Sequence, residues 1–321
     1  MRNKLLIATA LAVLIFTALG LQMRSEERND ELASRELLAE EQLRQLALLE
    51  RITLTRGEAQ VELARIDGNW GVLSHAGYPV QQERLAALLH ALRGARVVEE
   101  KTANPAHHAR LGLDAGEALL VQLHAAGQDF GVVYGNPVGS GQLVRFAASD
   151  QVLLISRPLS MSVDPNDWLA LKVIDLPMEQ VAEARWQHAD GELLQLAKRA
   201  RGDYNLSLQG LSEQEQGGNE RWINSMVLAL INLTAQNVAL REELALPEAM
   251  LQMQVSTWAG SQLEASLYEL DGSYWLLIDS LQLADEDREL PINADPRWAF
   301  QIGIAQLESL NKRQADILRT P

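Results

Sequence analysis

RITLTRGEAQVELARIDGNWGVLS, residues 51–74, decides the fold class of this chain. Apolar and polar residues alternate through the stretch, with breaks at the Gly57 turn and at the Asp67-Gly68 turn. A period of two indicates half-buried strands, and Asp-Gly between two alternating runs is a strong hairpin signal. We therefore expect strands near residues 52–56, 60–66 and 69–74.

An amphipathic helical pattern follows these strands in residues 78–100, YPVQQERLAALLHALRGARVVEE. Leu85, Leu88, Leu89 and Leu92 fall on one helical face. Gly94 is expected to end the helix, and residues 95–100 read as a short strand. Trp70, just after the Asp-Gly turn, is expected to cap the core between helix and sheet.

The same order recurs once further along the chain: residues 185–208 repeat the strands with their Asp-Gly turn, and residues 220–242 repeat the amphipathic helix and the short strand. At one constant offset, the helix and strand positions Leu85, Leu88, Leu92 and Val97 match Met226, Ala229, Leu233 and Val238. Trp70 is matched with Tyr204. Self-similarity at this long period predicts a duplicated domain and excludes a short-repeat solenoid.

The N-terminal segment MRNKLLIATALAVLIFTALGLQMR carries Arg2 and Lys4 ahead of an uncharged apolar run, Leu5–Leu21. That run reaches the lower limit of the roughly 17–25 residues that span a bilayer. One interpretation is a secretory signal cut after Gly20, and the other is an uncleaved signal anchor. The run exceeds a usual signal core of about 7–15 residues, which favours the anchor. The anchoring residues are then Leu5, Leu6, Ile7, Leu11, Val13, Leu14, Ile15, Phe16, Leu19 and Leu21.

Residues 25–50 contain no Gly or Pro and are rich in Glu, Leu, Arg and Ala, which are good helix formers. One interpretation is a stalk helix that meets a partner helix, and the other is a solvated helix lying on its own domain. In the first interpretation the partner contacts are Leu32, Leu43, Leu46 and Leu49.

We therefore expect an α+β protein with a single transmembrane helix and a stalk helix, followed by two related β-rich lobes. Each lobe would contain a hairpin, an amphipathic helix and a β-meander. The expected division is a signal anchor or transmembrane helix (1–24), a stalk helix (25–50), a first α+β lobe (51–160), a connector (161–180), a second α+β lobe (181–290) and a C-terminal strand and helix (291–321).

Composition excludes several classes of function. The 321 residues carry a formal charge of −15, so a nucleic-acid partner is not expected. There is no cysteine, which removes disulfides, thiolate metal sites and cysteine nucleophiles. With positive charges ahead of the apolar run, the bulk of the chain is expected outside the cytoplasm.

Two adjacent histidines, His107 and His108, are the most conspicuous titratable residues. Adjacent residues on a helix point about 100° apart, and metal pairs on helices usually stand four residues apart. We therefore expect a structural turn, with Asn104 as its N-cap, Pro105 at its first position and Gly112 at its end. One histidine would pack and the other would face water.

The sequence signals for other binding or catalytic sites are also weak. The glycine-rich residues 135–141 lack the Gly-Lys-Ser/Thr ending of a phosphate loop and read as a hairpin loop. The carboxylates in 164–168 and 284–289 lack EF-hand spacing and read as solvated turns. We expect no enzyme, no catalytic residue, no cofactor and no metal.

The chain resembles a bacterial domain-of-unknown-function family, number 4340. The resemblance rests on the order of GNWGVL, GYPVQQERLAALLHALRGARVVE, KTANPAHHARLGL and DWLALKVIDLPMEQVAEARW, and covers about residues 50–280. It implies an envelope-facing, single-span membrane protein associated with ABC-type transport systems of the gliding-motility kind. Those systems pair a permease with a large auxiliary membrane protein.

The expected function is therefore that of a non-catalytic accessory or scaffold subunit of an ABC-type transport complex. The protein would be anchored once in the bacterial inner membrane, with its C-terminal bulk in the periplasm. The alternative is a periplasmic module that binds glycan or lipid in a groove between the lobes. The C-terminal residues 297–318 either contribute to an interface or close the second lobe.

Overall fold

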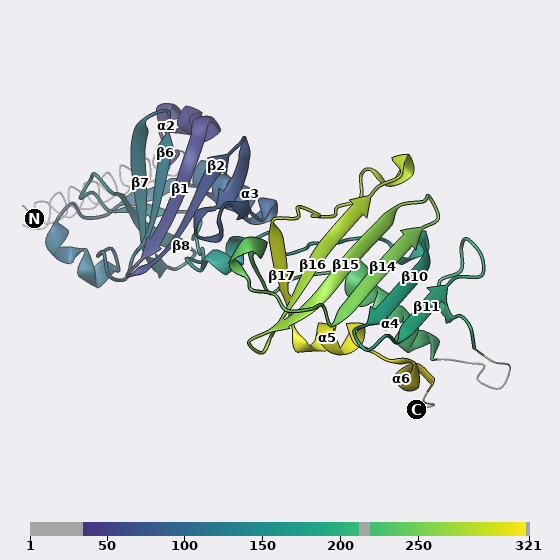
Figure 1. The fold of residues 1–321 in the computed structure, drawn as a ribbon. Coiled ribbons are helices and arrows are strands. Elements are labelled where there is room, and N and C mark those ends of the chain that lie inside the picture. The colour runs from purple at the N-terminus through teal and green to yellow at the C-terminus, as the bar shows by residue number, and fades with distance from the viewer. Residues whose placement is uncertain (1–34, 212–218, 319–321) are drawn as a thin grey trace, which may run out of the picture. The chain divides into compact units, whose positions relative to one another are not determined.

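The structure is a computed structural model that describes residues 35–211 and 219–318 (Figure 1). The chain divides into two compact units, Met1–Trp168 and Leu169–Pro321, which we call lobe 1 and lobe 2. The division falls inside the predicted connector, residues 161–180. The prediction of two β-rich lobes is confirmed, since each unit contains one large antiparallel sheet.

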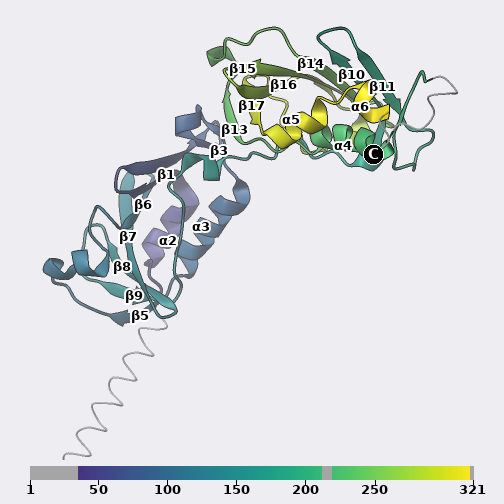
Figure 2. The ribbon, with the colours of Figure 1, turned by 90° about the horizontal axis from the view of Figure 1, so that it is seen from below.

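Lobe 1 contains a nine-stranded sheet in the order β4-β3-β2-β1-β6-β7-β8-β9-β5. Helix α3 (Gln82–Gly94) lies against one face of this sheet, and α2 (Glu40–Gln45) precedes it in the chain (Figure 2). The strands are β1 (Leu49–Arg56), β2 (Ala59–Ile66), β3 (Asn69–Val72), β4 (Tyr78–Pro79), β5 (Val97–Glu100), β6 (Leu119–Ala125), β7 (Gln128–Val138), β8 (Gly141–Phe146) and β9 (Leu153–Ile155).

Lobe 2 contains an eight-stranded sheet in the order β12-β11-β10-β14-β15-β16-β17-β13. Its helices are α4 (Glu220–Ile231), α5 (Ile304–Leu310) and α6 (Gln314–Leu318). The strands are β10 (Val181–His188), β11 (Leu193–Ala197), β12 (Ser207–Leu208), β13 (Asn237–Leu240), β14 (Leu251–Thr257), β15 (Gln262–Leu270), β16 (Ser273–Gln282) and β17 (Trp298–Ile302).

The two sheets share one strand order once the short edge strand β4 is set aside. In both, a three-stranded hairpin unit leads to a helix, an edge strand and a four-stranded meander. The central pairs β1–β6 and β10–β14 also shift register at the same place, between Leu49 and Arg51 and between Val181 and Glu183. A bulge at one matching position in both lobes indicates that they share register as well as topology.

The hairpin predicted from residues 51–74 is confirmed. Its strands are β1, β2 and β3, within a few residues of the expected bounds. Asp67 and Gly68 take φ angles of 51° and 87°, as a two-residue type I′ turn requires. The tryptophan after the turn, Trp70, is 8% exposed and lies inside β3.

The predicted match between the two helices needs a correction. The buried positions are Leu85, Leu88 and Leu92 in α3, and in α4 they include Ile223, Met226 and Leu230. Each of these positions of α4 lies 138 residues after its counterpart in α3, so that Met226 corresponds to Leu88. The sequence pattern instead matched residues 141 positions apart and paired Leu88 with Ala229.

The reason lies in the connection from helix to edge strand. Helix α3 ends at Gly94 and β5 begins at Val97, whereas α4 ends at Ile231 and β13 begins only at Asn237. The longer connection in lobe 2 shifts the sequence match by three residues. Leu233 consequently lies after α4, and Ala229 is only half-buried.

Tyr204 is also not the counterpart of Trp70, because its side chain is 51% exposed. It precedes β12 instead of lying inside it. Leu206, the residue directly before that strand, is fully buried in its place.

Each lobe begins with a segment that pairs with the chain just beyond its helix. In lobe 1 the Leu37 N–H donates to the Ala95 carbonyl at 2.8 Å, and the Val97 N–H donates to the Arg35 carbonyl at 2.9 Å. In lobe 2 the Val173 N–H donates to the Leu233 carbonyl at 2.8 Å, and the Ala235 N–H donates to the Leu171 carbonyl at 2.8 Å. The leading segments are therefore integral parts of the lobes.

The predicted stalk helix over residues 25–50 is not seen in the part of that range that is described. Within residues 35–50, the described part of that range, the only α-helix is α2 (Glu40–Gln45), and β1 already begins at Leu49. Leu37, Leu38, Leu46 and Leu49 are all buried. Helix propensity is a weak preference, and burial of these leucines in lobe 1 overrides it.

The expected anchor residues, Leu5–Leu21, and Leu32 lie outside the described residues. Within residues 35–211 and 219–318, no helix is both long enough and apolar enough to span a membrane.

The C-terminal residues 291–321 are expected to form a strand and a helix, and their described part forms the strand β17 followed by the helices α5 and α6. Strand β17 pairs with β13 and β16 and completes the lobe 2 sheet. The interpretation in which this segment closes the second lobe is the one the structure supports.

Replacing Leu88 with Ala should destabilise lobe 1 by about 2–5 kcal/mol, because Leu88 is fully buried between α3 and the sheet. Met226→Ala should have a comparable effect on lobe 2. Denaturant unfolding followed by circular dichroism measures both changes. Leu48→Ala is the control, since Leu48 is 59% exposed and should change stability by less than about 0.5 kcal/mol. Equal effects of Leu88→Ala and Leu48→Ala would contradict the packing described above.

Candidate functional site

The two adjacent histidines form the structural turn that the sequence predicts. The Asn104 side chain accepts a hydrogen bond from the Ala106 N–H at 3.0 Å, and Gly112 ends the turn with φ of 67°. His108 is 8% exposed, and its Nε2 bonds the Asp150 carbonyl at 3.1 Å, whereas His107 is exposed. The two side chains therefore differ in environment, and His108 joins the turn to the loop before β9.

The leucines predicted as partner contacts do not form one exposed stripe. Leu46 is 7% exposed and Leu49, in β1, is 2% exposed. Leu43 is half-buried, and Leu32 lies outside the described residues. Leu46 and Leu49 therefore serve the lobe 1 core, which corrects their expected role as contacts for a partner helix.

The other sequence candidates take structural positions. Residues 135–141 span the end of β7, the turn and the start of β8, as expected for a hairpin loop. In the acidic run 284–289, Asp287 is buried and its Oδ2 accepts from Thr257 Oγ1 and Ser261 Oγ, each at 2.6 Å. The expectation of a fully solvated turn is wrong for Asp287, whose buried carboxylate fastens the loop after β16. Among the described residues, no group of three His, Asp or Glu side chains could hold a metal ion.

The most distinctive surface is the sheet face of lobe 2 that carries the exposed side chains of β10, β11, β14 and β15. A row of polar residues crosses this face, because each is the direct cross-strand partner of the next. In spatial order the row is Gln195, Arg185, Gln254, Glu264 and Ser280. Beside it runs a second row, Gln187, Gln252 and Ser266. We call these two rows the polar face.

The polar face is hollowed in two places, each about 430 Å³ in volume. Arg185 and Gln254 line both hollows, so the two adjoin. Tyr268 lines the first hollow and also packs against the apolar cluster around Trp275. The aromatic ring therefore stands at the border between the polar face and that cluster.

A register shift in β15–β16 shapes one edge of this surface. Between Glu264 and Ala265 the pairing skips Asp279, which places an extra residue in β16. Bulges of this kind re-aim a side chain out of the regular ladder. Asp279 is exposed and accepts a 2.5 Å hydrogen bond from Ser266 Oγ, so a carboxylate stands beside the second polar row.

Many polar groups on this face have few partners within the protein. Gln254 Nε2 donates to Glu264 Oε1 at 3.4 Å, and Ser280 Oγ donates to Glu264 Oε2 at 2.9 Å. Arg185 donates to Gln187 Oε1 at 3.4 Å and forms no ion pair with a described residue. The side-chain amides of Gln195 and Gln252 make no hydrogen bond within the described part of the chain. Donors and acceptors are thus left facing solvent.

Lobe 1 has no equivalent surface at the matching register. Its first row reads Glu62, Thr53, Gln122 and Gly131, so Thr53 replaces Arg185 and Gly131 replaces Glu264. In its second row, Leu120 stands where lobe 2 has Gln252 and packs against an apolar cluster that includes Leu113 and Val133. The polar face is therefore a property of lobe 2 and not of the shared scaffold.

Sequence reasoning missed the polar face. The available signal is the i, i+2 spacing of polar residues, as in Gln252 and Gln254 and in Arg185 and Gln187. Such spacing marks one side of a strand. It does not reveal which strands are neighbours, and the row appears only once β10 and β14 are paired.

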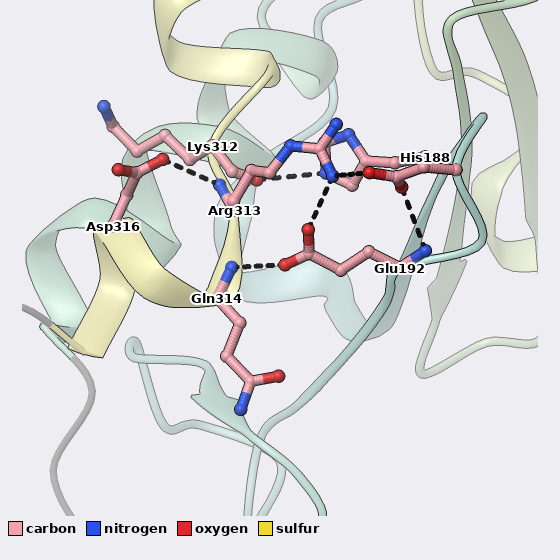
Figure 3. A network of polar contacts seen from close by, with 7 residues as sticks. His188, Glu192, Lys312, Arg313, Gln314 and Asp316 are labelled. Atoms are coloured by element: carbon pink, nitrogen blue, oxygen red, sulfur yellow. Dashed lines mark hydrogen bonds and ion pairs between the residues drawn. The ribbon is translucent and has the colours of Figure 1, made fainter.

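A second polar network fastens the C-terminal segment to the turn between β10 and β11 (Figure 3). Arg313 Nη1 contacts Asp190 Oδ2 at 2.6 Å and Glu192 Oε2 at 2.7 Å. The Gln314 N–H donates to Glu192 Oε1 at 2.7 Å. His188 Nε2 donates to the Lys312 carbonyl at 3.2 Å. We call these residues the C-terminal clamp.

Burial and charge set the protonation of the clamp. Burial lowers the pKa of His188, and the nearby Arg313 guanidinium lowers it further. His188 Nδ1 is buried without a hydrogen-bond partner among the described residues, so a proton there would lack an acceptor. The Glu192 N–H and then Arg313 lower the pKa of Asp190. Burial alone would raise the pKa of Glu192, but the hydrogen bond from the Gln314 N–H and the Arg313 guanidinium lower it, so that the pKa lies below its ordinary value.

Acidification from about pH 7.5 to 5.5 should therefore loosen the C-terminal segment. A histidine whose folded pKa lies below its ordinary value of 6.5 binds fewer protons when folded, so stability falls as pH falls through that value. Asp190 and Glu192 act with the same sign, but only below their ordinary values of 3.8 and 4.5. Hydrogen exchange of residues 310–318 measures the effect.

His188→Gln should remove most of this pH dependence, whereas His107→Gln, at an exposed histidine, should leave it intact. Unchanged exchange across this range in the unaltered chain would contradict the assigned role of His188.

Comparisons with known proteins place the chain in a family. A family described as "Domain of unknown function (DUF4340)" matches residues 70–252, from β3 of lobe 1 to the start of β14 in lobe 2. No curated protein and no solved structure matches the chain. The family match covers more than half of the 321 residues. The chain therefore belongs to the DUF4340 family, a family defined by a domain of unknown function.

Proposed function

We propose that this protein is a membrane-anchored periplasmic accessory or scaffold subunit of an ABC-type transport complex, and that it works by contact and not by catalysis. The observation that carries the proposal is the apolar run Leu5–Leu21, preceded by Arg2 and Lys4 and followed by two folded lobes. Inserted with these charges inside, such a run places the lobes in the periplasm. The partners are then a permease and its auxiliary membrane protein.

Chain length supports a position close to the membrane. Only residues 22–34 separate the apolar run from Arg35, where backbone pairing with lobe 1 begins. Thirteen residues span at most about 45 Å even when fully extended. Lobe 1 would therefore remain within reach of the outer parts of neighbouring membrane subunits.

The interior of the lobes suits a rigid support. Buried polar side chains hold loops in place, as His108 does with Asp150 and as Asp287 does with Thr257 and Ser261. In lobe 2, Trp186 Nε1 also donates to the Leu310 carbonyl at 3.1 Å and ties the end of α5 to β10. Loops and termini held in this way preserve the shape that a scaffold presents.

A cysteine at Ala115 should react with a membrane-impermeant maleimide in intact spheroplasts, because residue 115 is exposed on lobe 1 and the lobes are proposed to face the periplasm. The absence of native cysteine makes the labelling specific. Asn3→Cys is the matched control and should react only after lysis. Labelling of Ala115→Cys only after lysis would contradict the proposed topology.

Replacing residues 1–24 with a cleavable secretory signal should release folded lobes that no longer co-purify with the permease. The intact chain, extracted in mild detergent, should co-purify with both transport subunits. If the released lobes bind at full strength, the apolar run is only a tether. If the intact chain yields no transport subunit, the accessory role is wrong. If Leu21 is the first residue of the mature protein, the apolar run is a cleaved secretory signal and not an anchor.

A further inference from the structure

We propose that the polar face of lobe 2 binds a neutral oligosaccharide, laid across strands β10, β14 and β15. This activity goes beyond the proposed accessory role and does not depend on it. The geometry that points to it is the pair of adjoining hollows that share Arg185 and Gln254.

The chemistry of the face matches hydroxyl groups. The glutamine amides Gln187, Gln195, Gln252 and Gln254 each offer donors and an acceptor, as a sugar hydroxyl also does. Arg185 adds donors, and Glu264 adds acceptors. Since Gln195 and Gln252 make no internal hydrogen bond among the described residues, they can bond a ligand without breaking an existing contact.

The charges on the face disfavour other classes of ligand. Glu183, Glu264 and Asp279 line the hollows with Arg185 as the single cation, so the local charge is negative, as it is for the whole chain. An anionic ligand such as a phosphate or an acidic sugar would be repelled. The mostly polar lining gives little burial to a lipid chain, and it lacks the cluster of aromatic and apolar anchors on which protein interfaces depend.

The dimensions of the face suit a chain of several sugar rings. The first row crosses five strands, from β11 to β16, and neighbouring strands lie about 4.8 Å apart, which makes the row about 19 Å long. Tyr268 stands half-buried at its border, where an aromatic ring can contact the apolar face of one sugar. The charged residues of the first row belong to lobe 2, because lobe 1 carries Thr53 in place of Arg185 and Gly131 in place of Glu264.

Isothermal titration of the full chain in mild detergent tests the proposal. The probes are the neutral hexamers of β-1,4-linked N-acetylglucosamine and of α-1,4-linked glucose, and hexagalacturonate is the anionic comparison. We expect at least one neutral hexamer to bind and hexagalacturonate not to bind. The double variant Arg185→Ala/Gln254→Ala should weaken that binding by at least about tenfold.

The matched control is the double variant Thr53→Ala/Gln122→Ala, which makes the corresponding changes in lobe 1 and should leave the affinity unchanged. Circular dichroism of both variants confirms folding, and Gln252→Ala offers a milder change on the same face. If neither neutral hexamer binds at millimolar concentration, the proposal is overturned. So do equal losses in the two double variants, or tighter binding of hexagalacturonate. If Arg185→Ala/Gln254→Ala instead abolishes co-purification of the transport subunits and no sugar binds, the face is a protein interface.

Discussion

The backbone ladder between the two central strands of each sheet is the constraint on which the rest of the molecule depends. In lobe 1 it joins β1 to β6, and in lobe 2 it joins β10 to β14, with the register shift at the same place in both. A slip of one residue would turn every side chain to the opposite face. The ladder therefore decides which residues meet the helices in the core and which form the open face.

The shared register makes the differences between the lobes informative. Core positions keep their apolar character, as Ile52 in β1 and Ala184 in β10 show. On the open face the same positions diverge, from Thr53 and Leu120 in lobe 1 to Arg185 and Gln252 in lobe 2. An apolar cluster at Leu113 and Leu120 covers part of the face in lobe 1. A common scaffold thus carries two different surfaces, and the surface of lobe 2 is the one equipped to bind polar groups.

Local patterns could be predicted from the sequence, whereas features that depend on distant neighbours could not. Alternation and the Asp67-Gly68 turn act within a few residues, so the hairpin was predictable. The leucines of residues 35–50 misled the helix prediction, because their burial by lobe 1 is a tertiary effect. The offset error arose because matching residue types does not detect a longer connection after α4. The polar face depends on β10 pairing with β14, about seventy residues later.

Disulfide cross-linking tests the shared register most directly, because the chain has no cysteine of its own. Direct cross-strand partners have Cα atoms about 4.5–5.5 Å apart, within the range that a disulfide spans. We predict that Thr53→Cys/Gln122→Cys and Arg185→Cys/Gln254→Cys both oxidise to intramolecular disulfides. The slipped pairs Thr53→Cys/Val121→Cys and Arg185→Cys/Val255→Cys should stay reduced, because their side chains face opposite sides. Efficient cross-linking of a slipped pair in either lobe would contradict the common register.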